Sequence, residues 1–77
     1  MKFSIAVEFD DEIAASGYFQ GIDEFAICTS VAGEACIDYE ESGVKKLENG
    51  KFLTLFVVKN ISDLDYIAEQ IRRYEEA

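Results

Sequence analysis

The chain of 77 residues is long enough for one domain, and a hydrophobic content of 49% gives it material for a core and argues against a disordered segment. Its net charge of −9 argues against nucleic acid and anionic membranes as direct partners, because both repel it. No apolar run approaches the roughly 18 residues of a membrane span, and the chain starts with an alternating pattern instead of a signal peptide, so we expect a cytoplasmic protein.

The first predicted element is a strand at residues 3–9, where apolar and polar side chains alternate as on a half-buried sheet. A short helix follows it. Asp10 or Asp11 can cap the N-terminus of this helix, and Gly21 can end it. The pattern therefore predicts a strand that leads directly into a helix.

Two further strands are predicted as a hairpin over residues 25–40. The residues that alternate along one face of these strands are Phe25, Ile27, Thr29 and Val31, then Ala35, Ile37 and Tyr39. A loop of residues 31–33 would place Gly33 in a left-handed conformation and pair Cys28 with Cys36. A loop shortened to two residues would set apolar residues opposite acidic ones, so we prefer the longer loop.

A second hairpin is predicted to turn at Asn49 and Gly50, which is a strong signal for a two-residue turn. Gly43, ahead of it, suits a bulge. Residues 52–58 are almost wholly apolar, as is typical of a central strand. A helix capped by Ser62 closes the chain. Its apolar stripe consists of Leu64, Ile67, Ala68 and Ile71.

The predicted order is therefore β-α-β-β-β-α over a single domain of residues 1–77. Strands joined by short turns favour antiparallel pairing, and the amphipathic helices need a sheet to cover. We therefore predict a small α+β fold in which an antiparallel sheet is packed against one or two helices.

The sequence offers no recognisable catalytic or metal-binding group. It has no histidine, the commonest general base and metal ligand, and two cysteines cannot supply the four ligands of a zinc site. We therefore predict that the protein is not an enzyme and uses no metal or cofactor. Cys28 and Cys36 are expected to stay reduced in the cytoplasm, with a disulfide as the alternative in an oxidising compartment.

The charge is divided unevenly along the chain. Residues 1–44 hold ten acids and one base, whereas residues 45–77 hold six of each. No Lys or Arg occurs between Phe3 and Val44. One interpretation is a surface that serves solubility, which usually mixes both signs. The other is a surface that binds a basic protein partner.

The stretch ACIDYEES, residues 35–42, suggests how such a surface is built. On a strand, Asp38 and Glu40 would project from one face about 6.6 Å apart, a spacing comparable to that of phosphates along a nucleic-acid backbone. The alternative is an ordinary solvated sheet face. The predicted protein-binding residues are Asp38, Glu40, Glu41, Glu34, Asp10, Asp11, Glu12, Asp23 and Glu24.

With its base-free segment and its acidic runs EFDDE and DYEE, the chain resembles the small phage-encoded anti-CRISPR and DNA-mimic inhibitors. This resemblance rests on size, charge and composition, and no contact residue carries over from it. It implies a stoichiometric inhibitor that acts in a bacterial host and presents an acidic surface to a basic, nucleic-acid-binding groove, such as that of a CRISPR–Cas complex.

The competing hypothesis is a small structural or regulatory module that uses an apolar surface. Leu53, Leu55 and Val57 lie on the opposite face of their strand from Phe52 and Phe56. If the helices cover only one face, the three aliphatic residues would be exposed and would favour a dimer or an ordinary partner. Under the acidic-surface hypothesis we expect a monomer.

Overall fold

The computed structural model describes residues 1–27 and 37–76. It confirms an α+β fold with an antiparallel sheet and helices. The elements, in chain order, are β1 (Phe3–Phe9), α1 (Glu12–Ile22), the π-helix η1 (Asp23–Ile27), β2 (Gly43–Lys46), β3 (Phe52–Val58) and α3 (Ile61–Glu76).

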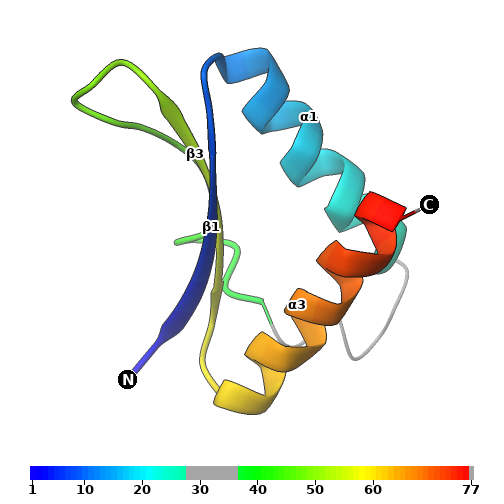
Figure 1. The fold of residues 1–77 in the computed structure, drawn as a ribbon. Helices are drawn as coiled ribbons and strands as arrows, with labels where there is room; N and C mark the ends of the chain where they lie inside the picture. The colour runs from blue at the N-terminus through cyan, green and yellow to red at the C-terminus, as the bar shows by residue number, and fades with distance from the viewer. Residues whose placement is uncertain (28–36, 77) are drawn as a thin grey trace.

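The sheet has the strand order β1-β3-β2, and both neighbouring pairs are antiparallel. All seven residues of β1 pair with β3, from Phe3 opposite Val58 to Phe9 opposite Phe52. β3 is therefore the central strand, as its apolar sequence predicts. Both α1 and α3 lie on one face of the sheet (Figure 1).

The core lies between this face and the two helices. Phe56 and Val58 of β3, Ile22 of α1 and Ile67 of α3 are fully buried. Phe19 of α1 stacks on Phe56 with 5.0 Å between the ring centroids. Aromatic and aliphatic side chains thus hold both helices to the central strand.

Helix α1 begins as predicted and ends later than predicted. The Asp11 carboxylate accepts a hydrogen bond from the Ala14 backbone N–H at 2.7 Å, which confirms it as the N-cap. Gly21 does not end the helix, which continues to Ile22 and into η1. A β-carbon at Gly21 would lie 2.7 Å from Cζ of Tyr74, so this glycine permits α3 to approach α1 closely.

Helix α3 begins one residue before the predicted cap. The carbonyl of Asn60 accepts hydrogen bonds from the backbone N–H groups of Asp63 and Leu64 at 3.1 and 3.3 Å. Ser62 therefore lies inside the helix, and the prediction that it is the cap is wrong. The predicted stripe is confirmed at Ile67, which is fully buried. Leu64 and Ile71 are partly buried, whereas Ala68 is exposed.

The hairpin predicted at residues 25–40 is wrong where the structure describes it. Phe25 lies in η1, and its ring meets that of Tyr74 at 5.9 Å between centroids. Helical continuation thus overrides the alternating pattern at residues 25–27, since tertiary context outweighs strand propensity. The Gly33 loop, Cys28 and Cys36 lie outside the described residues, as does Glu34.

The hairpin between β2 and β3 is confirmed, but its turn is one residue longer than predicted. Lys46 pairs with Phe52, and the N–H of Gly50 donates to the carbonyl of Leu47 at 3.1 Å. Gly50 takes a φ of +86°, so the loop spans residues 48–50 with glycine in the left-handed position. A two-residue turn would shift the register and turn Val44 away from the buried Thr54, which it now opposes.

Gly43 also has a positive φ, +125°, at the point where β2 begins. It follows the turn over residues 39–41, and few other residues adopt this conformation without strain. The structure thus gives Gly43 the special backbone conformation that a bulge would also need.

Candidate functional site

The predicted acidic residues gather at the two ends of α1. Asp10, Asp11 and Glu12 precede and begin the helix, and we name them the leading cluster. The trailing cluster consists of Asp23, Glu24, Asp38, Glu40 and Glu41. Glu12 and Glu24 are twelve positions apart, which corresponds to about 18 Å along a helix axis.

The leading cluster is open to solvent. The Asp10 side chain is 90% exposed. Its nearest cation is Lys51 in the β2–β3 hairpin, whose Nζ lies 3.6 Å from Asp10 Oδ1 and 3.8 Å from Glu8 Oε1. Asp11 and Glu12 stabilise the start of the helix, because negative charge there suits the helix dipole.

The trailing cluster is assembled from two segments far apart in the sequence. The Tyr39 hydroxyl donates to Asp23 Oδ1 at 2.7 Å, and this bond joins the turn over residues 39–41 to η1. Beside it, the Gln20 amide donates to Glu24 Oε1 at 3.0 Å. The bond between Tyr39 and Asp23 does not follow from the sequence pattern, which predicts Tyr39 on a strand.

The stretch ACIDYEES is not a strand where the structure describes it. Only Ile37 forms a bridge, with Val58, and residues 39–41 form a turn. Asp38 Oδ1 accepts the backbone N–H groups of Glu40 at 3.0 Å and Glu41 at 3.3 Å. This is an Asx turn, which the residue types Asp, Ser and Gly at positions 38, 42 and 43 could have indicated.

The other carboxylate oxygen of Asp38 pairs with Lys2, whose Nζ lies 2.9 Å from it and 3.0 Å from Glu41 Oε1. The hydrogen bond from Lys2 holds the pKa of Asp38 below its ordinary value. The Asp38 side chain is only 12% exposed. Asp38 therefore fixes the turn, and the predicted row of carboxylates on a strand face with Asp38 at its centre is wrong.

An open pocket of about 350 Å³ lies beside this turn. Its polar lining includes Asp38, Glu40 and Asp63 with Lys59 as the cation, and the other lining residues are Ile37, Tyr39 and Asn60. The lining holds no cysteine, serine or histidine. Across the described parts of the chain, no three Cys, Asp or Glu side chains are grouped so as to hold a metal ion.

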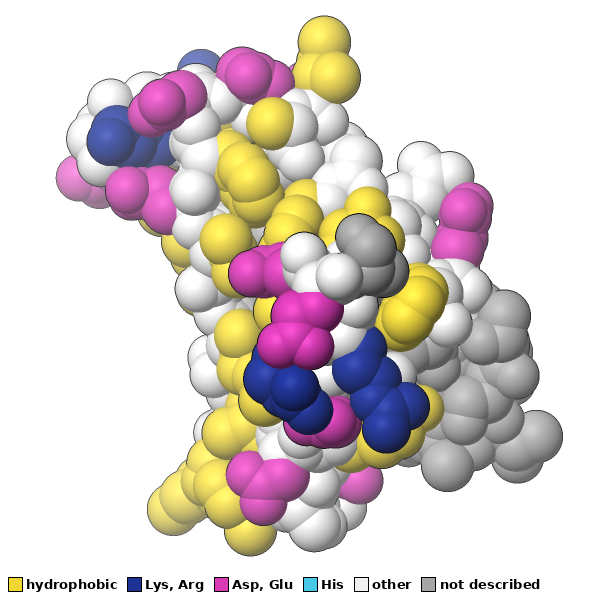
Figure 2. Space-filling view, turned by 45° about the vertical axis from the view of Figure 1, so that its right-hand side comes forward, with side chains coloured by type: hydrophobic (Ala, Val, Ile, Leu, Met, Phe, Trp, Pro, Cys, Tyr) yellow, Lys and Arg dark blue, Asp and Glu magenta, His cyan; other side chains and the backbone are white. Residues whose placement is uncertain are grey.

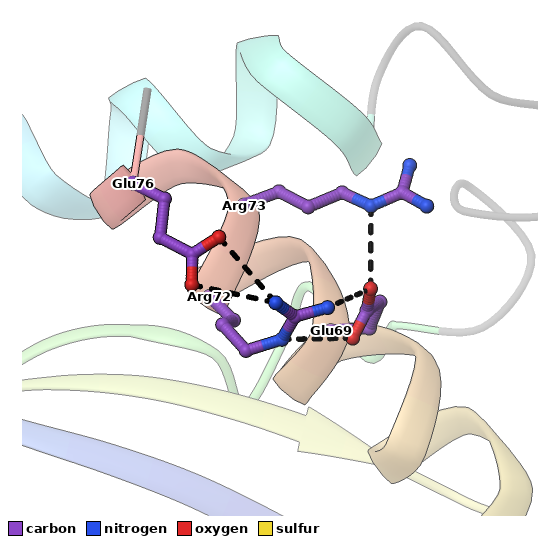
Figure 3. Close-up of polar contacts among 4 residues, drawn as sticks. All are labelled: Glu69, Arg72, Arg73 and Glu76. Atoms are coloured by element: carbon purple, nitrogen blue, oxygen red, sulfur yellow. Dashed lines mark hydrogen bonds and ion pairs between the residues drawn. The ribbon is translucent and has the colours of Figure 1, made fainter.

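The acids of α3 differ from those of both clusters because their paired bases, Arg72 and Arg73, lie on the same helix. Arg72 lies between Glu69 and Glu76, 3.4 Å from Glu76 Oε1, and Arg73 lies 3.3 Å from Glu69 Oε1 (Figure 3). Arg72 lowers the pKa of Glu69 by hydrogen bonding to it. Figure 2 shows both signs of charge side by side on the face that it presents. Among the described residues, the two clusters at α1 hold eight acids and have ion pairs with Lys2 and Lys51, so they carry a clear excess of negative charge.

No protein-family model, no curated protein and no solved structure matches this chain at a significant level. Within residues 1–27 and 37–76, no helix is both long and apolar enough to cross a membrane.

Proposed function

We propose that this protein binds a basic protein surface through the leading and trailing clusters and catalyses no reaction. The observation that supports the proposal is that α1 carries no base along its whole length and has acids at both ends. Long-range attraction by such a surface speeds encounter with a positively charged groove, and close charge pairs then add affinity.

The proposed partner is a nucleic-acid-binding protein or complex. A span of about 18 Å between Glu12 and Glu24 corresponds to roughly five base-pair steps of 3.4 Å along duplex DNA. A protein groove that holds phosphates over that length therefore presents lysine or arginine side chains to both clusters. Following the resemblance to anti-CRISPR and DNA-mimic inhibitors, we propose that the protein blocks such a groove stoichiometrically, with CRISPR–Cas complexes as the first candidates.

The structure changes which acids are expected to touch the partner. Asp38 is tied to Lys2 and to the backbone of its own turn, so it has little capacity left for a partner. Asp10 and Glu40 are exposed, and each represents one cluster. We therefore place the contact surface at the exposed acids of both clusters, with Asp38 as the residue that positions Glu40 and Glu41.

The test is a double charge reversal, Asp10→Lys with Glu40→Lys. Each reversal adds 2 to the net charge, so the variant changes from −9 to −5. The matched control is Glu48→Lys with Asp65→Lys, two exposed acids of the base-balanced segment that make the same change in charge. Displacement of labelled DNA from CRISPR effector complexes and other basic DNA-binding proteins is measured at low and high salt.

We expect the wild type to displace DNA at low salt and less so at high salt, because salt screens exposed charges. The Asp10/Glu40 variant should lose this activity and the control should keep it. Equal losses in both variants would show that only net charge matters. Full activity in both would assign the acidic clusters to solubility.

A further inference from the structure

The outer edge of β1 presents unpaired backbone groups. On β3, the Val57 N–H donates to Ser42 Oγ at 2.9 Å and the Val57 carbonyl accepts from the Asp38 N–H at 2.8 Å, both on the β2 side. The alternate residues of β3, such as Val58 and Phe56, therefore bond to β1. Their partners on β1 are the odd-numbered residues, from Phe3 to Phe9. The even-numbered residues Ser4, Ala6 and Glu8 therefore direct their N–H and C=O groups away from the sheet.

This edge carries few of the devices that usually protect a strand. β1 pairs with β3 over seven residues without a bulge, and the chain contains no proline. Ser4 and Ala6, at the middle of the edge, are small and exposed. Among the described residues, no hydrogen bond outside the sheet engages the backbone of β1. In Figure 1 no helix crosses in front of this strand.

We propose that β1 pairs antiparallel with β1 of a second copy of this chain, across a two-fold axis at Ile5. This register puts Lys2 of each copy opposite Glu8 of the other, and Ser4 opposite Ala6. Ser4, Ala6 and Glu8 of each copy, together with Lys2 just before the strand, then form four hydrogen-bonded pairs with about eight N–H···O bonds in all. The result is a continuous six-stranded sheet.

Charge favours this register over its neighbours, once Lys2 turns from Asp38 and Glu41 of its own copy, and Glu8 from Lys51, to pair across the two-fold axis. A shift of two residues sets Lys2 opposite Ala6 or sets Glu8 opposite Ser4, and it removes both Lys2–Glu8 pairs. A shift of one residue would put apolar side chains on the solvent face. The central register also sets Phe3 opposite Val7, and Ile5 opposite Ile5, on the face that carries the helices. Phe3, Ile5 and Val7 are already partly buried there in the single copy.

The open face of the sheet is a weaker route to a dimer. The helices do leave it uncovered, which was the condition for the apolar-surface hypothesis (Figure 1). However, Val57 is only 5% exposed, and the turn that contains Asp38 and Ser42 lies against it. Leu53 and Leu55 remain, both partly buried. The self-association that we infer at β1 departs from the monomer expected from sequence, and it does not depend on the proposed function.

The test measures the mass of the full chain by analytical ultracentrifugation over a range of concentrations. We expect a concentration-dependent dimer. Glu8→Lys sets a new lysine against Lys2 of the other copy, and Lys2→Glu sets a new glutamate against Glu8. Each variant alone should therefore dimerise about tenfold more weakly. Because Lys2→Glu also removes the ion pairs with Asp38 and Glu41, circular dichroism checks that its fold is intact. An equimolar mixture of the two variants should regain a dimer as strong as that of the wild type. In the heterodimer, positions 2 and 8 are both lysine in one copy and both glutamate in the other, so each cross-strand pair again joins opposite charges.

Glu48→Lys is the matched control, since it changes the net charge as Glu8→Lys does but lies in the β2–β3 turn. Ala6→Pro removes an outward N–H and should abolish dimerisation while circular dichroism shows an intact fold. A wild-type monomer at every concentration would overturn the proposal. So would a mixture that fails to regain the dimer, or a loss as large in the control as in Glu8→Lys.

Discussion

At the scale of single residues, Asp38 shows how one carboxylate can have a different role from the one its sequence pattern suggests. The alternation around it predicted an exposed strand position. In the structure, its carboxylate accepts hydrogen bonds from two backbone N–H groups and forms an ion pair with Lys2. Because Lys2 is 36 residues away in the sequence, no local pattern could reveal the pair.

This ion pair makes stability depend on acid. The pKa of Asp38 is lowered in the folded state by the hydrogen bond from Lys2, so its stabilising effect is complete above the ordinary aspartate pKa of about 3.9 and is lost as pH falls below it. Asp38→Asn should therefore be less stable than the wild type near neutral pH, and the difference should shrink below about pH 4. Urea unfolding at a series of pH values measures it. A difference that stays constant down to acid pH would contradict the ion pair.

Gly17 and Gly21 offer a matched pair of substitutions on one helix. Nothing lies within 4 Å of a β-carbon built at Gly17, so Gly17→Ala should raise the free energy of unfolding by about 0.5–1 kcal/mol. At Gly21 the same methyl group would collide with Tyr74, so Gly21→Ala should lower the free energy of unfolding by about 1–3 kcal/mol. Urea unfolding of both variants checks the contrast. Equal effects would mean that Tyr74 moves aside freely.

At the scale of elements, the sequence predicts well where one periodicity persists and burial agrees with it. β1 alternates over its whole length, β3 is apolar throughout, and α3 has a clear stripe centred on Ile67. The strand prediction fails at residues 25–27, which lie in η1, where Phe25 meets Tyr74, a residue nearly fifty positions away in the sequence. The turn after β2 fails by one residue because register depends on Val44 facing Thr54.

Ile67 tests the contact between α3 and the sheet. It is fully buried beside Phe56 and Val58 in the core cluster. Ile67→Ala should lower the free energy of unfolding by about 2–4 kcal/mol, from lost burial and the cavity left behind. Ala68→Ser, on the exposed side of the same helix, is the control and should change it little. An effect below about 0.5 kcal/mol at Ile67 would contradict its place in the core.

Thr54 tests the contact between α1 and the sheet. It is the buried polar side chain of the described core, and its hydroxyl donates to the Ala15 carbonyl at 2.8 Å. Thr54→Val keeps the shape and removes the donor, so it should lower the free energy of unfolding by about 1 kcal/mol. Thermal unfolding measures it. A more stable valine variant would show that burying the hydroxyl costs more than its hydrogen bond returns.

At the scale of the whole molecule, the sequence predicts the amount of charge but not its arrangement. The split between residues 1–44 and the rest follows from counting. The division into two clusters depends on α1, because the helix separates Glu12 from Asp23. It also depends on the hydrogen bond from Tyr39 to Asp23, which holds the turn of Glu40 and Glu41 beside η1. Such placement needs the tertiary fold.

The net charge also makes stability depend on salt. Repulsion within a surface that carries −9 opposes the compact state, and ions screen it. We expect the melting temperature to rise with added sodium chloride, and to rise less for the Asp10→Lys/Glu40→Lys variant with its charge of −5. Calorimetry at several salt concentrations checks this. A melting temperature that falls with salt would mean that attractive pairs such as Lys2–Asp38 outweigh the repulsion.

The central position of β3 has a consequence for how the chain acquires its fold during synthesis. β1 leaves the ribosome well before its partner strand, residues 52–58, has been made. The β2–β3 hairpin closes over only a few residues and can form early, whereas joining Phe3 to Val58 must close a loop of more than fifty. We therefore expect the N-terminal strand to dock late, and we expect repulsion within the acidic N-terminal part of the chain to oppose aggregation until it does.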